Sequence, residues 1–152
     1  MTHKVATVAL AALATMLLAV SHGHAGLLSC TFTEPFFTIQ YDSETRDVRR
    51  LSPDDTGPHA HEFKTEIVAR DATIVADKDW GEAPTARLMS GSEILMRLTF
   101  SGRGTDGMSD RLYPIEGVWG AEPRGNNVGG CSTDKAPGFD LYELYDELGL
   151  QP

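Results

Sequence analysis

Positive charge is scarce in this sequence, which has 13 Lys and Arg residues against 22 Asp and Glu residues and a formal net charge of −9. A negative field of this kind repels nucleic acid and anionic membrane surfaces. We therefore expect no nucleic-acid partner. The same charge favours either a cationic partner or simple solubility, and composition leaves both interpretations open.

The familiar sequence motifs of catalysis are also lacking. The chain has no G-x-S-x-G elbow, no G-x-x-x-x-G-K-[ST] phosphate loop and no H-E-x-x-H zinc helix. We expect a non-enzymatic protein without a cofactor. A small hydrolase is kept as an alternative, because a fold can bring Ser, His or carboxylate side chains together from distant positions.

One long apolar run is present, and it lies at the N-terminus. Val5–Val20 spans about 16 residues, whereas a membrane-spanning helix needs roughly 20. Lys4 precedes the run and the small residue Ala25 follows it, which is the pattern of a secretory signal peptide. The sequence predicts a signal peptide over residues 1–25, and a periplasmic or secreted domain over residues 26–152 with no stable membrane span.

Two other interpretations of the N-terminus stay open. The letters LLSC, which end at Cys30, form a poor lipoprotein box that would leave a lipidated Cys30 as the first residue. An uncleaved N-terminal anchor is the other interpretation. In each case the rest of the chain has the size of one domain. We expect a monomer, with a net charge of about −10 once Lys4 is removed.

Cysteine is limited to Cys30 and Cys131. An even number of cysteines in an oxidising compartment favours a disulfide. A bond that closes a loop of about 100 residues stabilises the fold by roughly 4–5 kcal/mol in the chain-entropy model. We predict this bond; two free thiols or a lipidated Cys30 are the alternatives.

Alternating apolar and polar residues dominate the rest of the chain and predict short β-strands. The pattern is clearest where Phe37, Ile39 and Tyr41 share one face, and in the hairpin around Gly91. The predicted strands lie within residues 36–42, 48–52, 62–69, 72–76, 86–100 and 111–119. Pro114 must lie at an edge, an end or a bulge, because it cannot donate a hydrogen bond to the ladder.

These patterns predict a mainly β fold: a small antiparallel barrel or sandwich with one short C-terminal helix. Residues 72–76 are short and apolar, which suits a buried strand. Phe36 and Phe37 must face opposite sides, so one ring belongs to the core. Residues 140–149 carry leucines at helical spacing, with Asp140 as N-cap and Gly149 at the C-terminus.

The stretch SGRGTDGMSDRLYPIEG, residues 101–117, holds glycines and two aspartates before an apolar segment. Asp106 and Asp110 could offer oxygens to Ca²⁺, but Met108 interrupts the spacing of an EF-hand and no glutamate follows at the right distance. We favour a structural loop, bent by Asp and Gly, that delivers the next strand. Met108 lies at its tip, either tucked under the loop or exposed to a partner.

A pair of histidines suggests a different site. His59 and His61 lie two residues apart, near Asp54, Asp55 and Glu62. Imidazole and carboxylate groups suit Zn²⁺ or Cu²⁺. A third ligand at a characteristic spacing is missing, so solvated histidines in a connecting loop are favoured. A periplasmic metal-binding protein that uses His59 and His61 is kept as an alternative.

Two segments together resemble a family of small bacterial exported proteins with an E-P-F-aromatic start and a D-G-M-S-D-x-x-Y-P motif. The first is TEPFF, residues 33–37, and the second is DGMSDRLYP, residues 106–114. That family is similar in style to META-type domains and to lysozyme-inhibitor barrels. The matching residues of the second motif are Asp106, Gly107, Met108, Ser109, Asp110, Tyr113 and Pro114.

The resemblance implies export and a compact β architecture, and it attaches no activity to the motif. The chain departs from the family where Phe37 replaces a common Trp and where Gly104 stands at a position expected to be Cys in relatives. We expect a domain that binds a partner or supports the envelope. Inhibition of a lysozyme is the most concrete form, because a cationic enzyme is attracted by negative charge.

Overall fold

The computed structural model describes residues 26–53, 62–77, 83–123, 127–134, 143–144, 148 and 150. These residues form a mainly β fold, as predicted. Nine strands make one antiparallel sheet in the order β4-β3-β2-β1-β11-β10-β7-β6-β5, and β8 and β9 form a separate pair. The strands are β1 (Leu27–Thr33), β2 (Phe36–Asp42), β3 (Val48–Pro53), β4 (Phe63–Ala69), β5 (Thr73–Ala76), β6 (Thr85–Ser90), β7 (Glu93–Thr99), β8 (Gly104–Thr105), β9 (Leu112–Tyr113), β10 (Ile115–Trp119) and β11 (Val128–Thr133).

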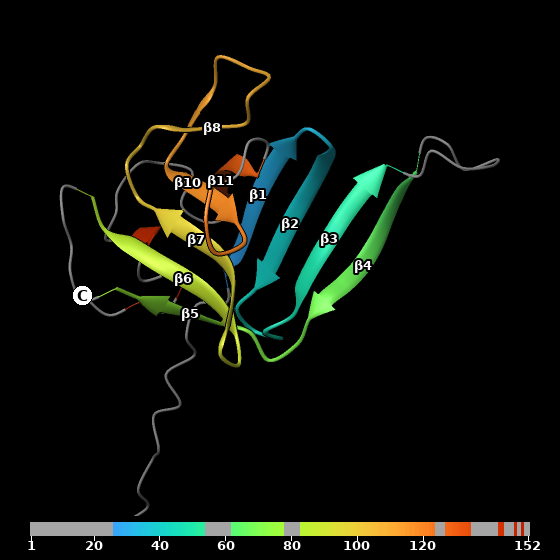
Figure 1. Ribbon diagram of the computed structural model, residues 1–152, viewed down its shortest axis with the longest axis vertical. Helices are drawn as coiled ribbons and strands as arrows, with labels where there is room; N and C mark the ends of the chain where they lie inside the picture. The colour runs from blue at the N-terminus through green and yellow to red at the C-terminus, as the bar shows by residue number, and fades with distance from the viewer. Residues whose placement is uncertain are drawn as a thin grey trace, which may run out of the picture.

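The sheet curls into a half-barrel rather than forming two packed layers (Figure 1). Strands β1 to β4 make one wing and β5 to β7 the other, with β10 and β11 between them (Figure 1). Since all nine strands belong to one continuous sheet, the sandwich alternative is wrong for the described part of the chain.

The two edge strands β4 and β5 are consecutive in sequence and joined by residues 70–72. Ala72 is fully buried, and its N–H donates to the carbonyl of Arg46 at 2.9 Å. The guanidinium of Arg46 donates to the carbonyls of Ala72 at 3.2 Å and Asp71 at 2.8 Å. This link is therefore fixed to the β2–β3 turn, and the two edge strands diverge from it (Figure 1).

The core lies on the inner side of the curl and confirms the alternation seen in the sequence. Phe37, Ile39 and Tyr41 of β2 are buried, while Phe36 is 37% exposed. The ring of Phe37 stacks on Phe32 with centroids 4.7 Å apart. Phe36 and Phe37 thus face opposite sides of the sheet, as expected.

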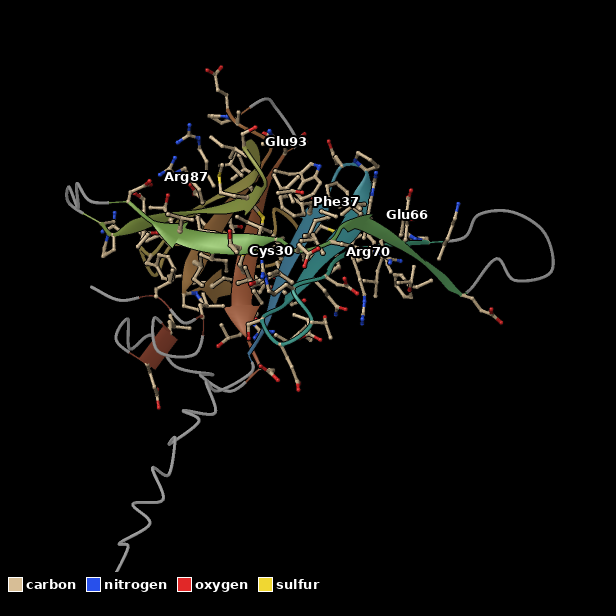
Figure 2. All side chains as sticks on the ribbon, turned by 90° about the horizontal axis from the view of Figure 1, so that it is seen from below. Cys30, Phe37, Glu66, Arg70, Arg87 and Glu93 are labelled. Carbon is tan, nitrogen blue, oxygen red and sulfur yellow. A yellow bond between two sulfur atoms is a disulfide. The ribbon has the colours of Figure 1, made fainter. Side chains whose placement is uncertain are left out.

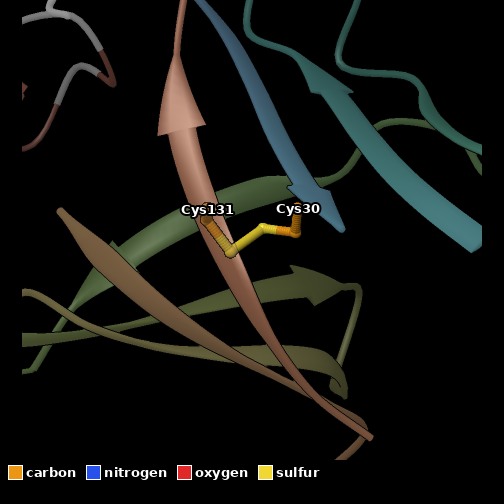
Figure 3. The surroundings of a disulfide bond; sticks show 2 residues. All are labelled: Cys30 and Cys131. Atoms are coloured by element: carbon orange, nitrogen blue, oxygen red, sulfur yellow. A yellow bond between two sulfur atoms is a disulfide. The ribbon is translucent and has the colours of Figure 1, made fainter. Parts of the chain in front are cut away.

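The predicted disulfide is confirmed. Cys30 of β1 and Cys131 of β11 lie directly opposite each other, with an S–S distance of 2.04 Å and both side chains fully buried (Figure 3). Gly117 of β10 makes room for it, because a Cβ there would lie 2.5 Å from Sγ of Cys131. The sulfur of Cys30 is committed to this bond, so the lipoprotein alternative does not fit the structure.

Two expectations about single elements need correction. Residues 72–76 were expected to form a buried strand, but β5 is an edge strand in which Thr73 and Val75 are exposed. The C-terminal helix expected over 140–149 is not shown, and most of it lies outside the described residues. Leu144 and Leu148 are nevertheless buried in the core, and Leu148 N–H donates to the carbonyl of Leu144 at 3.2 Å.

Candidate functional site

The candidate site is the hairpin formed by β8 and β9, whose connection, residues 106–111, we call the 106–111 loop. Gly104 pairs with Tyr113, and Thr105 pairs with Leu112. The hairpin projects beyond one end of the sheet (Figure 1). Pro114 is buried directly after β9, where its missing N–H breaks no ladder, and β10 begins at the next residue. The structure therefore brings the whole D-G-M-S-D-x-x-Y-P motif into one hairpin.

The carboxylate of Asp106 organises this loop through four hydrogen bonds. Its Oδ1 accepts from the backbone N–H groups of Met108 at 2.9 Å and Ser109 at 2.8 Å. Its Oδ2 accepts from the hydroxyl of Ser109 at 2.9 Å and the phenol of Tyr113 at 3.0 Å. Asp106 thus has the structural role favoured from the sequence.

These bonds also set the acidity of the carboxyl. The N–H groups of Ser109 and Met108, followed by the Ser109 hydroxyl, lower the pKa of Asp106 to about 2. Burial, and then the hydrogen bond to Asp106, raise the pKa of Tyr113 above its ordinary value. At neutral pH the loop therefore contains an ionised carboxylate that accepts a hydrogen bond from a neutral phenol.

Glycines allow the loop to sit close to the sheet. Gly107 has a φ of 76°, and a Cβ there would lie 3.0 Å from the hydroxyl of Thr33, the last residue of β1. Gly104 is buried, and a Cβ there would collide with the backbone carbonyl of Ile115. A Cys side chain therefore does not fit at position 104 of this chain.

Tyr113 joins the loop to the sheet. Its ring lies against Gly130 of β11, where any Cβ would collide with the ring atoms. On the loop side the guanidinium of Arg111 lies 4.9 Å from the ring centroid. Tyr113 contacts the sheet, and its hydroxyl donates to Asp106. It therefore holds the 106–111 loop in a fixed position relative to the sheet.

The exposed side chains of the hairpin include two large apolar ones, beside acidic Asp110 and basic Arg111. Met108 is 75% exposed and Leu112 is 57% exposed. Asp110 is exposed between them in sequence, and it makes no hydrogen bond or ion pair with any residue that the structure describes. Met108 is therefore at the surface rather than tucked under the loop.

The metal interpretations gain no support here. His59 and His61 lie outside the described residues. Within the described ranges no group of three or more His, Cys, Asp or Glu side chains is placed to hold a metal ion. Both oxygens of Asp106 already accept hydrogen bonds from the protein, which leaves calcium without its main expected ligand.

Within the described part of the chain, no helix has the length and apolar character needed to span a membrane. Comparison with protein-family models, with curated proteins and with solved structures gave no significant match. The function is therefore inferred from the geometry of the hairpin and from the sequence.

Sequence reasoning missed the residues that support the loop from outside the motif. These include Thr105, whose hydroxyl accepts from Gly107 N–H at 3.1 Å, and Gly130, which accommodates the Tyr113 ring. The adjacent glycines Gly129 and Gly130 were the available signal, because paired glycines within a strand often mark a close approach of another group.

Proposed function

We propose that this protein is an exported, non-enzymatic β-domain that binds a partner protein through the β8–β9 hairpin. The observation that carries the proposal is an apolar tip held on an ordered loop. Met108 and Leu112 are exposed although four hydrogen bonds to Asp106 fix the backbone around them. A preorganised loop loses little conformational entropy on binding. Burial of its exposed apolar side chains therefore contributes more fully to the free energy of binding.

The net negative charge of the chain favours a cationic partner. The chain carries a formal net charge of −9, which attracts positively charged proteins over long distances. Next to the apolar tip, the carboxylate of Asp110 offers an acceptor for a Lys or Arg of the partner. A lysozyme is the most concrete partner of this type. Export is supported by the N-terminal pattern and by the disulfide, which is compatible with an oxidising compartment.

The proposal is tested in a lysis assay, in which a lysozyme digests bacterial cell walls in the presence of increasing amounts of the protein. We expect inhibition at micromolar concentration. The variants Met108→Asp and Leu112→Asp should weaken it by about tenfold or more, since central apolar contacts dominate interfaces. Val75→Asp is the matched control, because Val75 is an exposed apolar residue of β5, outside the hairpin.

The outcomes separate two parts of the proposal. Absence of both inhibition and binding with lysozymes at micromolar concentration would remove the lysozyme as partner. Inhibition that Met108→Asp and Leu112→Asp leave unchanged would show that the hairpin is not the binding surface.

A further inference from the structure

The nine-stranded sheet ends in an edge strand, β4, that has no neighbour on its outer side among the described residues. It lies along the margin of the molecule (Figure 1). The edge of a sheet presents backbone N–H and C=O groups that can pair with another strand. In β4 the five residues from Phe63 to Ile67 are all exposed, although the strand is seven residues long and regularly paired with β3 over its first half.

The outer face of β4 is apolar at two positions. Phe63 is 57% exposed and Ile67 is 44% exposed, with Thr65 between them on the same face. The ring of Phe63 lies 6.3 Å from that of Phe36, which is also exposed. This group of side chains continues to the very edge of the sheet, where nothing in the described structure covers it.

The inner face of β4 carries two opposite charges. Lys64 and Glu66 are exposed, and neither side chain has a hydrogen bond or an ion pair with a residue that the structure describes. Glu66 lies opposite Arg50 of β3, whose guanidinium is 4.5 Å from the centroid of the Phe37 ring. Two charges of opposite sign thus stand at the edge, one on each side of Thr65.

The segment from Phe63 to Ile67 can pair favourably with a second copy of itself in the antiparallel direction. In an antiparallel pair centred on Thr65, Lys64 faces Glu66 of the other strand, and Phe63 faces Ile67. Opposite charges and apolar pairs directly across an antiparallel ladder are stabilising, whereas like charges are destabilising. A register centred on Lys64 or on Glu66 would place two like charges opposite each other, so the charges favour the register centred on Thr65 over its two neighbours.

We propose that β4 pairs antiparallel with β4 of a second copy of this chain, centred on Thr65, so that the two sheets continue into one. This pairing replaces the monomer expected from the sequence, and it does not depend on the function proposed for the β8–β9 hairpin. On the inner face it produces a row of alternating charges, in which Arg50 and Glu66 of one copy are followed by Lys64 of the other.

The expected dimer is weak. One strand of seven residues on each side buries less than the roughly 1,200 Å² of a standard interface, which is the range of transient complexes. We expect a dissociation constant in the micromolar range or weaker. Association is therefore measured over a concentration series by analytical ultracentrifugation, on protein exported by a host with its own N-terminal segment, so that processing is native.

Charge reversal provides the decisive test. Lys64→Glu and Glu66→Lys each place like charges across the proposed ladder, and each alone should weaken association by about tenfold or more. The double variant Lys64→Glu/Glu66→Lys restores opposite charges and should associate like the original chain. A mixture of the two single variants should also associate, because the all-acidic strand then faces an all-basic strand.

A matched control separates register from net charge. Glu93→Lys changes the charge by the same amount as Glu66→Lys, but it lies at the start of β7, away from Glu66 (Figure 2). It should leave association unchanged. The proposal is overturned if the original chain stays monomeric at every concentration, if single reversals have no effect, or if neither the double variant nor the mixture recovers association.

Discussion

Removal of the disulfide is the perturbation whose effect can be worked out most fully. The bond joins residues that are 101 positions apart, and it lies on the ladder between β1 and β11. A closed loop of this length stabilises the folded state by about 4–5 kcal/mol relative to the open chain. The variant Cys30→Ala/Cys131→Ala should therefore lose about 4–5 kcal/mol of unfolding free energy, which lowers Tm by about 15–20 °C for a domain of this size.

The assay is urea denaturation followed by circular dichroism, with calorimetry for Tm, on the original chain and on the double variant. Since typical domains have about 5–15 kcal/mol of stability in total, the double variant should be marginal but still fold at low temperature. A loss below about 1 kcal/mol would refute the reasoning, because the chain-entropy contribution of a loop of this length would then be absent.

A second substitution tests whether the sulfur atoms occupy the position described. A Cβ on Gly117 would lie 2.5 Å from Sγ of Cys131 and 3.3 Å from Sδ of Met96. Gly117→Ala should cost about 1–3 kcal/mol in the chain with the disulfide. In the Cys30→Ala/Cys131→Ala background the closest atom is missing, so the cost should be smaller by about 1 kcal/mol or more. Additive costs in the two backgrounds would contradict this packing.

Three further predictions concern the hairpin. Gly104→Ala should destabilise the fold by about 2–3 kcal/mol in urea denaturation, because the new Cβ collides with the Ile115 carbonyl; an unchanged midpoint would disprove the contact. Since the folded pKa of Asp106, about 2, lies below the ordinary value, its contribution to stability is complete above about pH 5 and is lost as pH falls toward 2. The protection factor of the Met108 amide proton, which compares its exchange rate with that of an unfolded chain at the same pH, should fall over that range. In Asp106→Asn, which has no carboxyl to titrate at position 106, the protection factor should not change with pH. Tyr113→Phe removes one donor to Asp106, so the pKa of that carboxyl should rise in an NMR titration; no rise would mean that the phenol does not contact it.

Local features of the fold follow from the sequence because they depend on neighbouring residues. The alternation in β2 places Phe37 and Ile39 in the core, and the turn at Gly91, with a φ of 57°, joins β6 and β7 where expected. The disulfide also followed from simple reasoning on an even number of cysteines. The strand pattern and the turn depend on residues close in sequence, and two cysteines allow only one intramolecular disulfide.

Features that depend on strand order could not be predicted. The segment of β5 has the composition of a buried strand, but its burial depends on whether a second strand lies on the edge away from β6, and none does among the described residues. Strands β1 and β11 were not recognised as strands. Gly129 and Gly130 lower the β-propensity of β11, and both positions are occupied by glycine because Phe32 and Tyr113 fill the space of a Cβ.

The residues of the candidate site could be predicted from the sequence, but the contacts between its two strands could not. Asp106 with Gly107 indicated a bent loop, and the hydrogen bonds from Met108 and Ser109 are local ones. The bond from Tyr113 required knowledge that β8 and β9 pair, which brings two residues seven positions apart into contact. That the tip is exposed, rather than folded under the loop, depends in turn on how the hairpin leaves the sheet.

The position of β1 beside β11 has a consequence for the order in which the sheet can assemble. Strands β1 to β4 form one continuous meander, and β5 to β7 begin a second, so each half can zip up from contacts that are near in sequence. Only the β1–β11 ladder unites the halves within the described sheet, and it spans nearly the whole domain. Such long-range closure is slow in comparison with hairpin formation. When the chain is synthesised or exported with its N-terminus first, β1 can pair with β2 early. The other edge of β1 stays unpaired until β11 has emerged.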